Sequence, residues 1–118
     1  MPPDERSRVG LLQGTLDLLI LRTLLAGPAH GHAIAKHIQR TSEELLQVET
    51  GSLYPALHRL EAKGWIAPSW ELSNKGKRAR FYRLTPRGRK QLVAERSKWA
   101  AFSRAMALIL NPADEEPR

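Results

Sequence analysis

The stretch GSLYPALHRLEAKGW, residues 51–65, decides how this sequence folds. Three leucines spaced four and three apart share one face of a helix: Leu53, Leu57 and Leu60. Gly64 follows them, and glycine is the residue that commonly ends a helix. Pro55 near the start costs about 3 kcal/mol in a helix interior but little in the first turn. Burying each leucine contributes about 1.5–3 kcal/mol, so the pattern predicts a helix despite the proline.

The face opposite the leucines carries side chains suited to nucleic acid. Their donors can reach guanine N7 and O6 or phosphate oxygens. The predicted DNA-contacting residues of this helix are Ser52, Tyr54, Pro55, His58, Arg59 and Lys63. The proline ring, without an N–H, would let the helix front approach DNA closely, with Tyr54 beside it. A second interpretation of Tyr54, as a half-buried packing residue, stays equally open.

The rest of the chain supplies the elements around this helix. Apolar spacing predicts one helix from Thr15 to just before Gly27 and a second from Gly31 to about Thr41. Two β-rich runs, 65–72 and 80–84, flank the turn residues Asn74 and Gly76 and predict a hairpin. A long final helix begins at Thr85-Pro86 and ends near Asn111.

This order predicts a mainly α fold with a small β-hairpin, a winged helix-turn-helix followed by a long C-terminal dimerisation helix. The chain divides into a flexible N-terminal arm (1–10), a winged-helix DNA-binding domain (11–85), the dimerisation helix (86–111) and a polar tail (112–118).

Positive charge gathers around the predicted hairpin. The chain has a net charge of +7, and residues 75–90 hold eight basic residues with no acid among them. Four of these are at or beside the hairpin tip, where they would follow a phosphate backbone: Lys75, Lys77, Arg78 and Arg80. The alternative is a solvated basic face without a partner.

A heptad pattern in the last helix predicts a homodimer. Apolar residues fill the a and d positions, and only Glu95 interrupts them. The predicted interface consists of Leu92, Trp99, Phe102, Met106 and Ile109, together with a second apolar stripe on the first helix, Leu18, Leu21 and Leu25. Trp99 packs against its symmetry mate in the favoured interpretation, and in the alternative it forms a flat slot for a small aromatic effector.

Other functional classes lack support in the sequence. No cysteine is present, and His30, His32 and His37 do not converge, so we expect no metal and no cofactor. We find no nucleophile elbow, phosphate-binding loop or paired carboxylates, so we expect no enzyme. No apolar run is long enough to span a membrane and no export signal precedes the first helix, so we expect a cytoplasmic protein.

Two long motifs, GSLYPALHRLEAKGWI and RARFYRLTPRGRKQL, resemble the PadR family of bacterial transcriptional regulators. The resemblance extends over about residues 12–110 and implies a dimer that binds a palindromic operator, usually as a repressor. By position it implies DNA contacts at Ser52, Tyr54, Pro55 and His58 in the helix and at Lys77, Arg78 and Arg80 in the wing. It also places Trp99 where some members stack aromatic ligands. His30 and His32 stand where members often have tyrosines, which leaves a phosphate contact there open.

The sequence therefore predicts a homodimeric, sequence-specific DNA-binding regulator, a repressor that a small-molecule effector releases from double-stranded DNA. The alternative function is a winged-helix module for protein interaction or small-molecule binding without operator binding.

Overall fold

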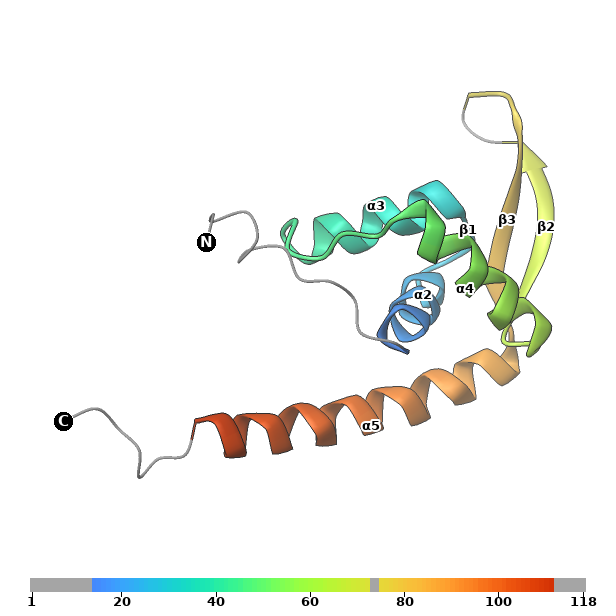
Figure 1. The fold of residues 1–118 in the computed structure, drawn as a ribbon. Helices are drawn as coiled ribbons and strands as arrows, with labels where there is room; N and C mark the ends of the chain where they lie inside the picture. The colour runs from blue at the N-terminus through green and yellow to red at the C-terminus, as the bar shows by residue number, and fades with distance from the viewer. Residues whose placement is uncertain (1–13, 73–74, 112–118) are drawn as a thin grey trace.

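The computed structural model describes residues 14–72 and 75–111, and Figure 1 shows their arrangement. Along the chain the elements are α2 (Thr15–Leu25), β1 (Ala29–His30), α3 (Gly31–Thr41), α4 (Thr50–Ala62), β2 (Ile66–Leu72), β3 (Arg78–Leu84) and α5 (Pro86–Leu110). The predicted fold class is confirmed: a winged helix followed by a long C-terminal helix. The predicted arm (1–10), the predicted tail (112–118) and the turn residue Asn74 lie outside the described residues.

The core lies where α2, α3 and α4 meet the base of the sheet. Its fully buried large side chains are Ile20, Leu21, Ile34, Leu57, Leu60 and Ile66. The leucine face of α4 is buried as predicted, with Ala56 beside it. The opposite face of α4 is therefore held outward by the packing of its leucines.

The two ends of α4 differ in how well the sequence predicts them. Gly64 has a positive φ of 75°, and its N–H donates to the Glu61 carbonyl while the Trp65 N–H donates to Leu60. These two bonds form a Schellman motif, so the predicted stop is confirmed. Pro55, however, is the sixth residue of α4 and lies beyond the first turn. It removes the bond that its N–H would make to the Gly51 carbonyl, a cost that the buried leucine face offsets.

The wing is a three-stranded antiparallel sheet rather than a hairpin alone. Its strand order is β1-β3-β2, and β1 pairs Ala29 with Tyr82 and His30 with Phe81. A strand of two residues has no alternation that a sequence could reveal. His30 also caps α3, because its Nδ1 accepts a hydrogen bond of 3.1 Å from the Ala33 N–H. β1 thus fixes the start of α3 against the base of the wing.

Thr85 connects the end of α4 to the start of α5. Its Oγ1 accepts from the Gly88 N–H at 3.0 Å and donates to the Gly64 carbonyl at 2.7 Å. A side chain on Gly88 would clash with the Trp65 carbonyl, so glycine is needed at this crossing. From there α5 runs along α2, and its C-terminal half continues past the helical core (Figure 1).

Candidate nucleic-acid interface

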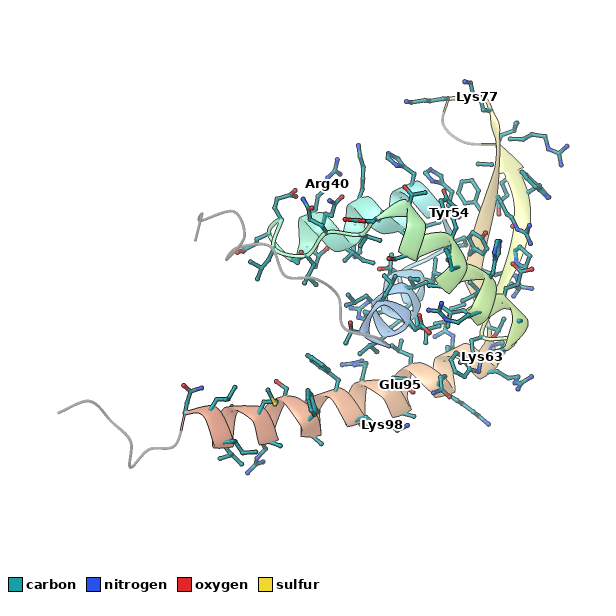
Figure 2. The ribbon with its side chains drawn as sticks, in the orientation of Figure 1. Arg40, Tyr54, Lys63, Lys77, Glu95 and Lys98 are labelled. Atoms are coloured by element: carbon teal, nitrogen blue, oxygen red, sulfur yellow. The ribbon has the colours of Figure 1, made fainter. Side chains whose placement is uncertain are left out.

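A groove lies between the start of α3, the outward face of α4 and the wing. Its volume is about 700 Å³. The residues that line it are His30, Gly31, His32, Ala33, Lys36, Tyr54, His58, Lys75, Lys77, Arg78, Ala79, Arg80 and Tyr82. Figure 2 shows Tyr54 near the wing and Lys77 at the wing tip. The groove thus brings together residues from three elements that are far apart in the sequence.

The groove has a strongly positive lining. Five lysine and arginine side chains line it, and no aspartate or glutamate does within the part of the chain that the structure describes. Three of the predicted wing residues, Lys75, Lys77 and Arg78, are exposed there. Such a cationic concave surface with aromatic and imidazole groups fits the phosphates and base edges of nucleic acid.

Tyr54 is a half-buried packing residue and also lines the groove, where its DNA contact stays a prediction. Its side chain packs on α3 so closely that a Cβ added to Gly31 would lie 2.9 Å from the hydroxyl oxygen. The tyrosine nevertheless remains 41% exposed on the groove side. Gly31 is buried and leaves room for the ring. Tyr54 therefore fixes α4 against α3 and presents its hydroxyl at the groove.

The remaining α4 residues differ in their position relative to the groove. His58 lines it, whereas Ser52 and Pro55 are exposed but do not line it. Lys63 lies at the far end of the helix, where its Nζ is 4.6 Å from the centre of the Trp65 ring. His32, where the resemblance left a phosphate contact open, lines the groove together with Lys36, which the sequence did not single out. The signal for this pair is their spacing of four residues on one exposed face of α3.

Arg59 is exposed on α4 and forms an ion pair within the chain. Its Nη2 lies 2.8 Å from Asp17 Oδ1, so the guanidinium joins α4 to the first turn of α2. A DNA contact at Arg59 stays a prediction, and the guanidinium would have to leave Asp17 to make it.

Arg80 is also held within the chain. Its guanidinium donates to both carboxylate oxygens of Glu61 on α4, at 2.9 and 3.0 Å. It also lies 5.9 Å from the ring centre of Tyr82, whose pKa burial raises above its usual range, an effect that the Arg80 charge partly opposes. Arg80 thus attaches the wing to α4 and also lines the groove, where its phosphate contact stays a prediction. Both hydrogen bonds come from the Arg80 Nη2, and charge-assisted bonds of this kind join the wing to α4.

The histidines do not form a metal centre. His30 and His32 stack with ring centres 6.4 Å apart, and His30 meets Phe81 edge-on at 5.3 Å. Among residues 14–72 and 75–111, no three histidine, cysteine or carboxylate residues are grouped so as to hold a metal ion. In those same ranges, no helix is long and apolar enough to cross a membrane.

Comparison with known proteins assigns the family. The model of the transcriptional regulator PadR-like family matches residues 20–94. The chain belongs to this family. A PadR family regulator from Clostridium difficile has a similar structure, with 30% identity and a TM-score of 0.72 over 83% of this chain and 100% of that one. A transcriptional regulator from Clostridium thermocellum has 31% identity and a TM-score of 0.73, over 80% and 91% of the two chains.

A curated relative of this PadR-like chain is a transcriptional regulator, Rv3488, from Mycobacterium tuberculosis. The two are 35% identical over 67% of this chain and 70% of that protein. The chain is thus a PadR-like transcriptional regulator with a winged-helix domain.

The predicted dimer residues of the PadR-like chain separate into two groups. Trp99, Phe102, Met106 and Ile109 are exposed along the C-terminal half of α5. Leu18 and Leu25 are partly buried at the edge of the core. Leu21 and Leu92 are buried in the chain's own core, at 0% and 3% exposure, so the prediction that they face a second subunit is corrected. Both residues belong to one core cluster, to which α2 and α5 contribute by packing on each other within one chain.

Proposed function

We propose that this PadR-like regulator is a homodimeric repressor that binds a specific operator in double-stranded DNA. The cationic groove between α3, α4 and the wing is the observation that supports DNA binding most strongly. In this proposal α4 enters the major groove and the wing follows the adjacent backbone. Tyr54 and His58 would face base edges, while Ser52 and Pro55 would lie close to the backbone.

The basic side chains of this surface have two proposed roles: some contact phosphates, and one positions the wing. Lys75, Lys77 and Arg78 would contact phosphates, because they are exposed at the wing and line the groove. His32 and Lys36 on α3 would add contacts to the same strand. Arg80 would hold the wing at its angle to α4 through Glu61, and Lys63 would make at most a peripheral backbone contact.

The proposed dimer forms through the apolar seam of α5. Trp99, Phe102, Met106 and Ile109 are between 40% and 74% exposed in the single chain. A patch of this kind marks an interaction surface, and a second copy with the same seam matches it. Two-fold symmetry would then place the two α4 helices at half-sites about 34 Å, or a multiple, apart.

A small aromatic effector would release the DNA by binding at Trp99. The indole ring borders an open pocket between α5 and α2, next to the proposed dimer seam. A ligand there that fits one dimer geometry better than another shifts the population away from the DNA-binding form. The size of the response equals its difference in affinity for the two forms.

Selection of duplexes from a random-sequence pool tests the proposed function. The proposal expects a palindromic consensus whose binding weakens steeply as salt rises. Retention of random duplexes at low salt, without any enriched sequence, would contradict operator binding. Absence of any retention would favour the alternative, a winged-helix module for protein or small-molecule binding.

A further inference from the structure

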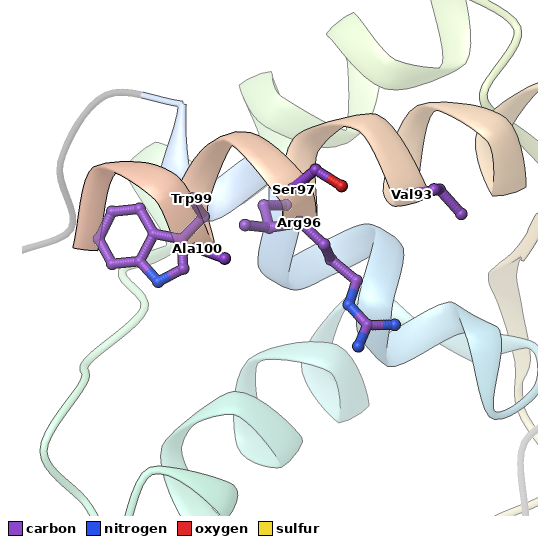
Figure 3. Close-up of a pocket in the computed structure, with 6 residues that line it drawn as sticks. Val93, Arg96, Ser97, Trp99 and Ala100 are labelled. Carbon is purple, nitrogen blue, oxygen red and sulfur yellow. The ribbon is translucent and has the colours of Figure 1, made fainter. Parts of the chain in front are cut away.

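Among the tryptophan, tyrosine and phenylalanine side chains, Trp70 on the wing is the most exposed. It is 59% exposed, against 43% for Trp99, which lies on α5 beside the pocket shown in Figure 3. Trp70 belongs neither to the core cluster nor to the lining of the cationic groove. Any role of its indole ring must therefore come from its neighbours on the wing.

The neighbours of Trp70 on the adjacent strand are two arginines. Trp70 pairs with Arg80 in the register of β2 and β3, and Leu72 pairs with Arg78. Side chains two residues apart on a strand share one face, so Arg78 is a diagonal neighbour of Trp70. The guanidinium carbon of Arg78 lies 5.5 Å from the centre of the indole ring, within the range of a cation–π contact. The indole thus has one arginine directly opposite and a second over its face.

The two arginines are held in different ways. Arg80 is bound to Glu61, which joins it to α4. Arg78 forms no ion pair among residues 14–72 and 75–111, and its guanidinium rests on the Trp70 ring instead. Arg78 is also exposed and lines the cationic groove. The indole is therefore placed to orient a cation whose charge is available to a phosphate.

Within the described part of the chain, no carboxylate is paired with Arg78 on this face of the wing. Glu71 is the acid of β2, but it is adjacent to Trp70 in sequence and so lies on the opposite face of the strand. There it accepts a hydrogen bond of 2.9 Å from the Ser69 hydroxyl. Glu61 on α4 is already paired with Arg80. The face that carries Trp70 thus presents positive charge outward.

We propose that Trp70 is a positioning residue for DNA binding, whose indole holds the Arg78 guanidinium in the orientation that contacts the DNA backbone. This inference rests on the proposed function, because it assumes that the wing binds DNA. An unrestrained arginine side chain samples many rotamers, and ordering it on binding costs free energy. Stacking on a flat ring restricts the guanidinium before DNA arrives, so less free energy is lost. Trp70 does not line the groove, so it acts on affinity through Arg78.

A double-mutant cycle on DNA affinity tests whether the two side chains act together. A backbone contact does not depend on base sequence, so one fluorescent duplex of arbitrary sequence at low salt serves as the probe. We expect Trp70→Ala to weaken binding about two- to fivefold, the equivalent of one exposed cation–π contact. In the Arg78→Ala background the same change should have no further effect, because the guanidinium that it positions is gone. Equal losses in both backgrounds would show that Trp70 contacts DNA itself, and no loss in either would show that Arg78 needs no positioning. Both results would overturn the proposal.

Two further variants separate the aromatic ring from its apolar bulk. Trp70→Phe keeps an aromatic face and should retain most of the affinity, whereas Trp70→Leu, which lacks one, should behave like Trp70→Ala. Leu72→Ala is the matched control, because Leu72 is 70% exposed two residues further along the same strand, and this variant should bind like the unaltered protein. Full affinity of Trp70→Leu, or a loss in Leu72→Ala as large as that in Trp70→Ala, would overturn the role of the ring.

Proton chemical shifts of the DNA-free protein test the stacking separately from DNA binding. Ring currents of the Trp70 indole should move the Arg78 Cδ and Nε proton resonances upfield, and Trp70→Ala should abolish this displacement. Ordinary Arg78 shifts in an unaltered protein that binds DNA would overturn the positioning role and leave the proposed function standing. Displaced Arg78 shifts in a protein that retains no duplex would instead contradict the proposed function, on which the role of Trp70 in DNA binding rests.

Discussion

Two exposed surfaces of this protein present opposite chemistries. One is the groove between α3, α4 and the wing, and the other is the C-terminal half of α5, called its free half below. The groove is cationic, and the elements that shape it are held together by Glu61–Arg80 and by Tyr54 on Gly31. The free half of α5 exposes Trp99, Phe102, Met106 and Ile109, and its N-terminal half packs on α2. A charged surface is well hydrated in water without DNA, whereas an apolar stripe of this length is expected to be covered by a partner at all times.

The contrast shows that the two proposed tasks, DNA recognition and dimer formation, lie on separate parts of one small chain. The winged-helix domain builds its core from its own residues, and α5 takes part in that core only as far as Leu92. From residue 96 to residue 110, every residue of the helix is exposed. The proposed recognition and assembly surfaces therefore use different residues and can each be changed by their own substitutions, which makes the comparison testable.

The largest expected effect concerns the apolar seam. Phe102→Glu with Ile109→Glu should convert the protein to monomers, since each buried side chain contributes about 1.5–3 kcal/mol and each change counts twice in a symmetric dimer. Operator binding should fall with it, because two half-sites are no longer joined. Sedimentation velocity measures the mass. Arg104→Glu, on the same helix but outside the heptad seam, is the matched control, and a double variant that stays dimeric would refute the seam.

The next effect concerns the wing. Lys77→Ala with Arg78→Ala should weaken binding to every duplex, by about 1.5–3 kcal/mol for each lost charged contact. The slope of log affinity against log salt should become shallower by about 0.9 per phosphate contact. Retention assays at several salt concentrations measure both quantities. Lys98→Ala on α5 serves as the control, and a slope that matches the unaltered protein would place the wing outside the interface.

A smaller effect is expected at the base edges. His58→Ala should cost about 1–3 kcal/mol on operator duplexes and much less on random ones, because a base contact discriminates between sequences. Arg59→Ala should leave this discrimination intact, since its guanidinium is bound to Asp17. Competition between operator and random duplexes measures the difference. Equal losses on both for His58→Ala would make it a phosphate contact.

The smallest effect tests the attachment of the wing. Glu61→Gln weakens the pair with Arg80, and because both side chains are about one third exposed, the free energy of unfolding should drop by about 1 kcal/mol or less. Operator affinity should fall while the salt slope stays unchanged, because no phosphate contact is lost. Urea unfolding and salt-dependent retention together measure this. A change in slope for Arg80→Gln would instead show that Arg80 reaches the DNA.

Local signals made most of the fold predictable. The leucine spacing of α4, Gly64 at its end and Thr85-Pro86 at the start of α5 each act within a few residues, and each is confirmed. The two-residue strand β1 was not predicted, because its pairing with Phe81 and Tyr82 crosses some fifty residues. Sequence patterns predict elements from local spacing and cannot show which distant backbone completes a sheet.

The candidate site was predictable in composition but not in the direction of each side chain. The outward face of α4 and the basic wing could be identified, and the groove unites Tyr54, His58, Lys75, Lys77 and Arg78. The ion pairs of Arg59 and Arg80 could not be predicted, because their carboxylate partners are 42 and 19 residues away. Leu18 and Leu21 share one predicted stripe of α2, and only the packing of the folded chain shows that Leu21 is buried in the core while Leu18 lies at its edge.

The central claim is that two copies of α4 read one operator through a dimer joined by α5. Hydroxyl-radical footprinting of a selected operator duplex measures this directly. The account predicts two protected regions related by two-fold symmetry, with centres about 34 Å or a multiple apart, and their joint loss in the Phe102→Glu, Ile109→Glu variant. A single protected region, or uniform protection along the duplex, would contradict it.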